Sequence, residues 1–341
     1  MTNRRLGLVV ILAVALAAFA SAQQATFRSA VDAVVVPVSV TDRNKPVPHL
    51  SSADFELSDN GVRQDVTVTA IDTMPTDVTF LVDTSGSVTG KALERVKIDL
   101  QTMSDLMQPN DRVRVVSFAR DATDAFSFVP GGATLDFTRL TSGGTTSLYD
   151  ALVTTLAGSP ATDRPHMVFV VTDGRDNSSF TSADDVIEVA RISGAVLCVA
   201  LVASSNPLVR EGGRLEAVDP LASEQSVTNL PAVSGSNIVT ASPFGTMPAP
   251  ATAIVRNTGP YRGGPNMPAL NAAVGATGGL VYSDSTRTPM PVLFRRVLDD
   301  FRASYVLTYV PTGVERSGAH TIAVRVKNRS YVVRARKSYA G

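Results

Sequence analysis

The sequence predicts an α/β fold with a doubly wound, mostly parallel sheet, together with a smaller β-sandwich-like domain that the N- and C-terminal strands form jointly. Three observations support this prediction. Between residues 76 and 302, short apolar strands alternate with amphipathic helices. Before and after this stretch, the pattern changes to short strands separated by turns, without helices. The 341 residues also exceed the usual size of one domain, roughly 150 residues, so more than one unit is expected.

Residues 1–22 have the pattern of an export signal that is removed from the mature chain. Arg4 and Arg5 form a short positive region, an apolar run covers residues 6–19, and Ala20-Ser21-Ala22 is a small-residue cleavage site. An uncleaved anchor is the alternative, but the apolar run is short for a membrane span of about 20 residues. Because no second candidate span follows in the sequence, we expect an exported chain, periplasmic or extracellular, whose mature form has no membrane span.

Composition and residue spacing exclude several function classes. Lysine plus arginine and aspartate plus glutamate both number 31, so there is no basic surplus for binding nucleic acid. The only cysteine, Cys198, lies in an apolar run and is expected to pack as a small hydrophobic residue, without an internal disulfide. The three histidines, His49, His166 and His320, lie in separate segments without zinc-site spacing, so no catalytic role is expected for them.

Two terminal segments, residues 25–73 and 303–341, carry the strand patterns of the smaller domain. The predicted strands cover residues 34–40, 55–58 and 65–71 in the first segment and residues 304–309, 320–326 and 331–336 in the second. The first segment is too short to build a good core alone, so we expect the second to complete it. Six basic residues alternate with apolar ones near the C-terminus and are expected on the solvated face of a strand pair: Arg325, Lys327, Arg329, Arg334, Arg336 and Lys337.

Residues 76–302 carry the alternating pattern of the larger domain, interrupted by one unusual segment. The predicted strands cover residues 78–82, 113–118, 166–172, 195–202 and 280–282, and the predicted helices cover residues 91–107, 147–156, 184–192, 270–279 and 291–301. Residues 204–268 are rich in Pro, Gly, Ser, Asn and Thr, and we interpret them as a long loop insertion.

Polar residues follow three of these elements at positions that can converge. Asp83-Thr84-Ser85-Gly86-Ser87 directly follows a buried strand, and Asp173 ends another. Thr145 and Thr146 lie in a glycine-rich loop before a helix. Because open α/β sheets bind ligands at the carboxyl ends of their strands, these three loops predict a binding site at one sheet edge.

This arrangement resembles the metal-ion-dependent adhesion site of the von Willebrand factor A domain, also called the integrin I domain, which is written Asp-x-Ser-x-Ser with a distant Thr and a distant Asp. Asp83, Ser85 and Ser87 match the first element, and Asp173 in Thr-Asp-Gly matches the last. The spacing Thr-x-Leu-Tyr-Asp-Ala selects Thr146, with Thr145 as the nearby alternative.

The resemblance spans about residues 77–301, apart from the insertion, and implies a Rossmann-like fold. With its flanking segments, the mature chain resembles the bacterial exported "VWFA-related" family.

The resemblance implies that Asp83, Ser85, Ser87, Thr146 and Asp173 bind Mg²⁺ or Mn²⁺, with Ca²⁺ as a further alternative. Such hard cations prefer oxygen ligands. In the family, the hydroxyls coordinate directly, the aspartates act largely through water, and one position is left for a carboxylate of the partner. The expected function is therefore metal-dependent protein binding, in adhesion or assembly, with a partner that presents an acidic residue.

Other interpretations of the same residues remain open at the level of sequence. The Asp83 loop taken alone could simply cap the following helix, and a bound metal could only stabilise a structural component of the cell envelope. A hydrolase is the least supported alternative, since Gly86-Ser87-Val88-Thr89-Gly90 misplaces the serine of the Gly-x-Ser-x-Gly pattern by one residue. We therefore expect no enzymatic activity. Asp176 and Asn177 are expected to be solvated rim residues rather than ligands.

Overall fold

The computed structural model describes most of the chain outside its N-terminus and the predicted insertion. The described residues are 33–86, 88, 90–159, 164–201, 216–218, 267–283 and 288–341. The predicted export signal at residues 1–22 and Ser87 of the predicted metal site lie outside them. In these described ranges, no helix has both the length and the apolar character needed to cross a membrane.

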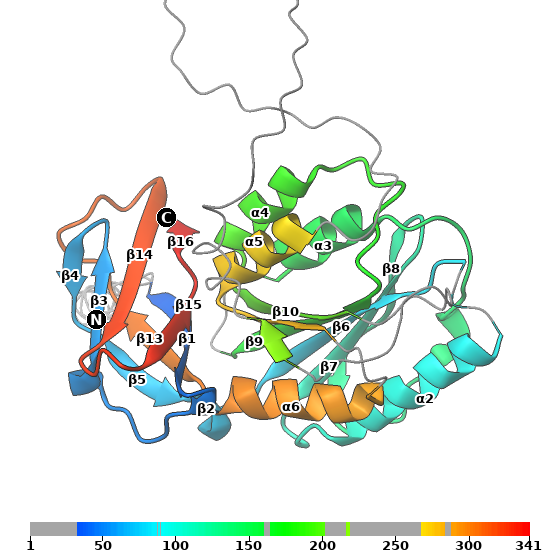
Figure 1. The fold of residues 1–341 in the computed structure, drawn as a ribbon, viewed down its shortest axis with the longest axis horizontal. Coiled ribbons are helices and arrows are strands. Elements are labelled where there is room, and N and C mark those ends of the chain that lie inside the picture. Colours follow the sequence, from blue (N-terminus) through cyan, green and yellow to red (C-terminus); the bar gives the residue numbers. More distant parts are fainter. Residues whose placement is uncertain are drawn as a thin grey trace, which may run out of the picture. The chain divides into compact units, whose positions relative to one another are not determined.

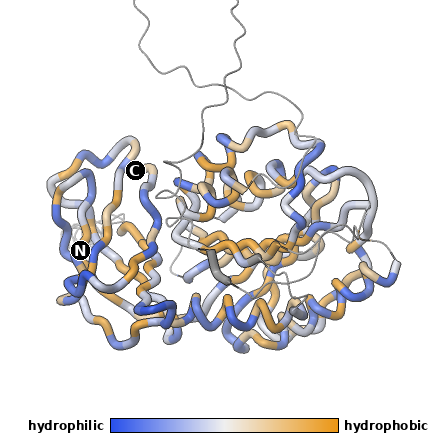
Figure 2. The backbone as a smooth tube through the Cα atoms, in the orientation of Figure 1, coloured by the Kyte–Doolittle hydropathy of each residue, from blue (hydrophilic) through white to orange (hydrophobic). Residues whose placement is uncertain are grey.

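A seven-stranded sheet forms the centre of the larger domain, in the order β11-β12-β10-β9-β6-β7-β8 (Figure 1). Its strands are β6 (Asp77–Asp83), β7 (Arg112–Phe118), β8 (Ala122–Pro130), β9 (His166–Thr172), β10 (Ala195–Leu201), β11 (Glu216–Val218) and β12 (Val281–Ser283). The strands from β12 to β7 are parallel, whereas β11 and β8 run antiparallel at the two edges. Strands buried on both faces are continuous apolar runs, as Figure 2 shows for the central strands.

Helices cover both faces of this sheet (Figure 1). One face packs against α2 (Lys91–Asp105) and α6 (Met290–Arg302), and the other packs against α3 (Leu148–Ala157), α4 (Ala183–Ile192) and α5 (Met267–Thr277). Alternation along β6 places Phe80 in the first core and Leu81 in the second. In the first core, Phe80, Phe169 and Phe294 meet edge to face, with ring centroids 5.0, 5.3 and 6.4 Å apart.

The terminal strands form two sheets that pack on a common core. One has the order β15-β1-β13-β5, with β2 also paired to β1, and the other has the order β16-β14-β3-β4. Their bounds are β1 (Val34–Asp42), β2 (Lys45–Pro46), β3 (Phe55–Asp59), β4 (Val62–Gln64), β5 (Thr67–Ala70), β13 (Tyr305–Tyr309), β14 (Ala319–Val326), β15 (Val332–Ala335) and β16 (Ser338–Ala340). Both sheets contribute buried side chains to this core, among them Val36, Leu57, Leu307 and Ile322. The predicted fold class, including the joint sandwich, is confirmed.

Several short elements differ from the sequence-based prediction. β8 was not predicted, because extra residues in β8, between Phe126 and Val129 and between Asp124 and Phe126, shift its register against β7 and break the alternation. β4 and β16 were also missed, and each is only three residues long. β11 lies inside the segment interpreted as a loop insertion and pairs with β12. Short 3₁₀ helices occur at Ser52–Asp54, Ile71–Thr73 and Phe137–Arg139.

Arg336 contradicts the prediction that the C-terminal basic residues lie on a solvated face, since it is only 5% exposed. Its guanidinium donates to the carbonyl oxygens of Ser338, at 3.0 Å, and Arg191, at 3.4 Å. Arg191 lies in the last turn of α4, where the carbonyl groups favour a cation. Burial lowers the pKa of Arg336. The prediction was wrong here because the pattern of one strand does not reveal what packs over it.

Candidate metal centre

Asp83 ends β6, which lies between β9 and β7 in the middle of the sheet. Its side chain is largely buried, at 9% exposure, and its Oδ1 accepts a hydrogen bond from the backbone N–H of Ser85 at 2.8 Å. This bond turns the chain sharply after the strand. Asp83 and Ser85 therefore lie together in a largely buried loop at the carboxyl end of the sheet.

Backbone hydrogen bonds join this loop to the glycine-rich loop before α3. The N–H of Gly86 donates to the carbonyl of Gly144 at 3.0 Å, and the N–H of Gly143 donates to the carbonyl of Thr84 at 2.9 Å. A Cβ atom on Gly86 would lie 3.2 Å from the oxygen of Gly144, so a side chain there would crowd this contact. The first two predicted loops are thus brought together.

Thr146 is fixed within the second loop by a reciprocal pair of hydrogen bonds to Asn177. The N–H of Thr146 donates to Asn177 Oδ1 at 2.8 Å, and the N–H of Asn177 donates to the carbonyl of Thr146 at 2.9 Å. Thr146 is buried, whereas Thr145 is exposed. This geometry favours Thr146 over Thr145 as the candidate ligand. It also shows that Asn177, expected only on a solvated rim, links the second loop to the third.

Asp173 follows β9 in the third loop, and the pairing of β6 with β9 places Val82 opposite Val171. The ends of the two strands are therefore adjacent, with Asp83 on one and Asp173 just beyond the other. Asp173 Oδ1 accepts from the N–H of Arg175 at 3.0 Å, and the Arg175 guanidinium lies 3.8 Å from Asp173 Oδ2.

The local charge of this cluster favours a cation. Burial raises the pKa of Asp83, hydrogen bonds from Ser85 lower it, and repulsion from the Asp173 carboxylate raises it further. Two carboxylates close enough to repel in a partly desolvated site are stabilised when a cation lies between them.

The donor types fit a hard divalent cation. Asp83, Ser85, Thr146 and Asp173 offer two carboxylates and two hydroxyls, all oxygen ligands of the kind that Mg²⁺ and Mn²⁺ accept. Ser87, the fifth predicted ligand, lies outside the described residues. In the part of the chain that the structure describes, no group of three or more His, Cys, Asp or Glu side chains could hold a metal ion. The candidate set differs from such a group, because it combines only two carboxylates with serine and threonine hydroxyls.

The structure also shows where the remaining reactive side chains lie. His166 is in β9, at its amino end, and His320 is in β14 of the sandwich. Cys198 is buried in β10, and burial raises the pKa of its thiol to about 11, which agrees with the predicted packing role. None of these three residues belongs to the cluster around Asp83.

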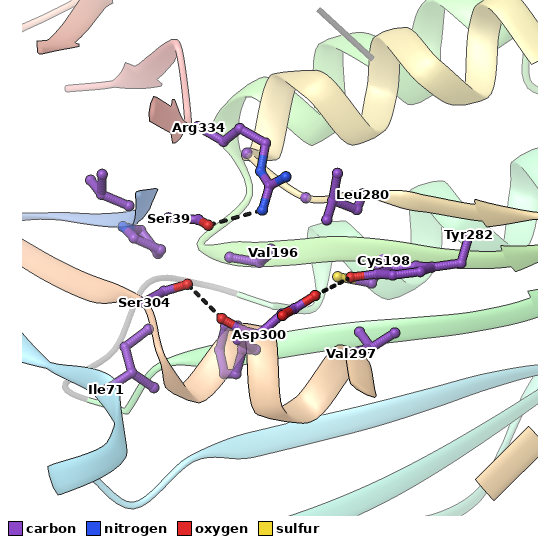
Figure 3. Close-up of a pocket in the computed structure, with 15 residues that line it drawn as sticks. Ser39, Ile71, Val196, Cys198, Leu280, Tyr282, Val297, Asp300, Ser304 and Arg334 are labelled. Carbon is purple, nitrogen blue, oxygen red and sulfur yellow. Dashed lines mark hydrogen bonds between the residues drawn. The ribbon is translucent and has the colours of Figure 1, made fainter. Parts of the chain in front are cut away.

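A small cavity elsewhere lies between the sandwich and the α6 side of the larger domain (Figure 3). Its volume of about 30 Å³ suits one or two water molecules. The hydroxyl of Tyr282 donates to Asp300 Oδ2 at 3.2 Å, and Arg334 donates to Ser39 Oγ at 2.9 Å, both at this cavity. Burial raises the pKa of Asp300. The cavity is too small to compete with the sheet edge as the site of an organic ligand.

The sequence of this chain was compared with family models and with known proteins. The family model described as the von Willebrand factor type A domain matches residues 77–208. No curated protein sequence matches the chain.

This chain also matches solved structures, among them the following three. The ArnB paralog VWA2 from Sulfolobus acidocaldarius is 12% identical, with 48% of this chain and 44% of that chain covered and a TM-score of 0.34. An aerotolerance-related membrane protein from Bacteroides fragilis is 15% identical, covering 66% and 98%, with a TM-score of 0.38. The manganese-loaded TRAP protein of Plasmodium vivax is 21% identical, covering 43% and 61%, with a TM-score of 0.29. This chain thus spans less than half the length of the first of these structures.

Proposed function

Because residues 77–208 of this chain match the family model of the von Willebrand factor type A domain, we propose that the protein is a metal-dependent protein-binding module. The observation that carries the proposal is the convergence of the loops bearing Asp83, Thr146 and Asp173 at one edge of the sheet. Ser85 and Ser87 would complete the set that holds Mg²⁺ or Mn²⁺. When bound, the ion supplies a positive charge that attracts a carboxylate of the partner.

The composition of the cluster supports binding rather than catalysis. A serine hydrolase needs a base, most often histidine, within hydrogen-bond reach of its nucleophile. His49, His166 and His320 all lie away from Ser85, in the sandwich or at the amino end of β9. We therefore propose no enzymatic activity for this site. We also propose that the chain is exported, to the periplasm or the cell exterior, on the basis of the signal pattern in residues 1–22.

Titration calorimetry with Mn²⁺ and Mg²⁺ tests the metal site directly. The wild-type chain should bind one ion saturably, and Asp83→Ala and Thr146→Ala should weaken binding by about 100-fold or more. Thr145→Ala is the matched control, because it removes an exposed hydroxyl next to the candidate ligand, and it should keep the wild-type affinity. Circular dichroism of each variant establishes that it is folded. Absence of binding by the wild type, or equal losses in Thr145→Ala and Thr146→Ala, would reject the site.

A second measurement separates protein binding from a purely structural metal. If the metal serves a partner, binding to immobilised peptides that contain Asp or Glu should require Mn²⁺ and disappear in EDTA. If Mn²⁺ instead raises the unfolding temperature while no acidic peptide binds, the structural role in the cell envelope is the better explanation. Peptide binding and thermal unfolding, each measured with and without Mn²⁺, thus distinguish the two functions.

A further inference from the structure

The segment that follows Asp173 is fastened step by step to the start of α3. Beyond the Asn177–Thr146 pair, the hydroxyls of Ser178 and Ser147 lie 2.8 Å apart. Ser179 Oγ accepts from the N–H of Tyr149 at 3.1 Å and from the N–H of Asp150 at 3.2 Å. The rim of the candidate metal centre is therefore held in register with the helix that follows Thr146.

The last of these connections fixes the backbone of Phe180. The Asp150 carboxylate accepts from the N–H of Phe180 at 3.0 and 3.1 Å, from the N–H of Thr181 at 2.8 Å and from the Thr181 hydroxyl at 2.7 Å. A carboxylate that accepts several hydrogen bonds in this way holds a loop firmly. Asp150 thus fixes the chain at the position where the Phe180 side chain emerges.

The Phe180 side chain is 97% exposed, more than any other large apolar residue in the described ranges. Ile98 and Ile192 follow, at 59% and 56%. Single exposed apolar side chains are common on protein surfaces, so exposure alone indicates nothing. Phe180 differs because its backbone is held by a carboxylate and because it lies on the rim of a candidate binding site. An aromatic ring on a backbone that is already fixed binds a partner at a lower cost in conformational entropy than a ring on a mobile loop.

The sequence separation between Thr146 and Asp150 limits how far the Phe180 backbone lies from the site. Asp150 follows Thr146 by four residues, so their Cα atoms lie no more than about 14 Å apart, and the Phe180 backbone is bonded to Asp150. On the same rim, the half-exposed guanidinium of Arg175 adds positive charge next to Asp173. Once a cation is bound between the carboxylates, the rim combines positive charge with one exposed aromatic ring.

We propose that Phe180 is an anchor for an apolar side chain of the partner segment whose carboxylate reaches the metal. The partner is thus a protein segment in which an Asp or Glu and an apolar residue lie about 6–12 Å apart, or two to four positions in an extended chain. Arg175 and the bound cation select the acidic residue by charge, and Phe180 selects the apolar one. This inference rests on the proposed function and specifies its partner.

Selection of phage-displayed random dodecapeptides tests the inference. Peptides bound to the wild-type chain in Mn²⁺ and eluted with EDTA should contain an Asp or Glu with an aromatic or aliphatic residue two to four positions away. Against Phe180→Ser, the acidic residue should persist while the apolar preference is lost. Ile192→Ser is the matched control, because it removes an exposed apolar residue at the opposite end of α4, and it should keep both preferences.

Affinities of one selected peptide complete the test. Phe180→Ser should weaken its binding by about tenfold or more, as for a residue that dominates an interface, whereas Mn²⁺ affinity should not change. Replacing the apolar residue of the peptide by Ser should weaken its binding to the wild type. The same replacement should not weaken its binding to Phe180→Ser any further, because the contact is already lost there. Selected peptides that carry only the acidic residue would overturn the role of Phe180 and leave the metal site intact. Failure to select any Mn²⁺-dependent peptide would overturn the proposed function and this inference with it.

Discussion

Nδ1 of His320 lies 2.8 Å from Oδ1 of Asp59 in the interior of the sandwich, where neither side chain is exposed to any significant degree. The other carboxylate oxygen of Asp59 accepts from the hydroxyls of Tyr309, at 3.0 Å, and Tyr339, at 2.7 Å. Asp59 ends β3, whereas its partners lie on β13, β14 and β16. One carboxylate from the N-terminal segment therefore holds three strands of the C-terminal segment.

We expect Asp59→Ala to destabilise the chain by about 3–5 kcal/mol, because it leaves a buried imidazole and two buried hydroxyls without their acceptor. Urea unfolding, followed by circular dichroism, measures this cost. Asp65→Ala is the control, since Asp65 is an exposed carboxylate in the same domain, and it should change stability by less than about 1 kcal/mol. Equal effects of the two substitutions would contradict a specific role of the buried network.

The pairing of Asn177 with Thr146 gives a prediction for metal affinity. Asn177→Ala removes the acceptor of the Thr146 N–H, so the threonine is less well positioned as a ligand. Residues that orient metal ligands typically contribute 10–100-fold in affinity, and we expect a loss of about this size for Mn²⁺ in calorimetry. Asn328→Ala removes an exposed asparagine whose side chain accepts from nearby Ser330, and it serves as the control. Wild-type affinity in Asn177→Ala would show that the loops hold Thr146 without this pair.

The sequence predicted the part of this site that depends on strand ends. Asp83 and Asp173 end or follow long apolar strands, and the carboxyl ends of neighbouring parallel strands meet wherever the sheet forms. The bonds that hold Thr146 and Phe180 could not be predicted, because Asn177 and Asp150 become neighbours of these residues only after the third loop packs on α3. A polar residue in a loop gives no sign in the sequence of which backbone group it will bind.

The same reasoning explains which elements of the fold were predicted. β9 and β10 are buried on both faces, and their apolar runs mark them directly. β8 is an edge strand with a register shift, so its side chains follow no simple alternation. β16 is short and is stabilised by pairing with β14, a contact far along the chain that no local pattern encodes.

Gly278 gives a prediction about how closely β15 approaches the larger domain. Gly278 has a φ of +79°, and a Cβ atom there would lie 2.9 Å from the Ala335 backbone in β15. Gly61 has a similar φ of +82°, but nothing lies within 4 Å of its Cβ position. Both alanine substitutions should cost about 1 kcal/mol for the left-handed conformation. Gly278→Ala should cost a further 1–3 kcal/mol or so, because β15 must move.

Urea unfolding of the two glycine variants measures the difference, and their shared backbone conformation makes Gly61→Ala the matched control. A larger loss for Gly278→Ala is expected. Equal losses would show that β15 moves aside without measurable cost, so that its contact with Gly278 contributes nothing to stability.

The burial of His166 leads us to expect that the free energy of unfolding depends on pH. It is buried in β9, with Nε2 2.9 Å from the Thr79 hydroxyl, and burial lowers its pKa from 6.5 to about 4. In the unfolded chain the imidazole takes up a proton near pH 6.5, whereas the folded chain resists protonation until about pH 4. The contribution of neutral His166 is therefore complete above pH 6.5 and is lost as the pH falls toward 4. At roughly 1.4 kcal/mol for each pH unit, this difference is on the order of 3 kcal/mol.

His166→Gln cannot take up this proton, so its stability should fall less steeply between pH 6.5 and pH 4 than that of the wild type. Urea unfolding at intervals across this range gives the two profiles, and their difference isolates His166 from the carboxylates that titrate in the same window. His49→Asn replaces an exposed histidine with a φ of 62°, a conformation that asparagine tolerates, and it should follow the wild-type slope. Parallel profiles for wild type and His166→Gln would mean that the buried imidazole does not contribute to acid sensitivity.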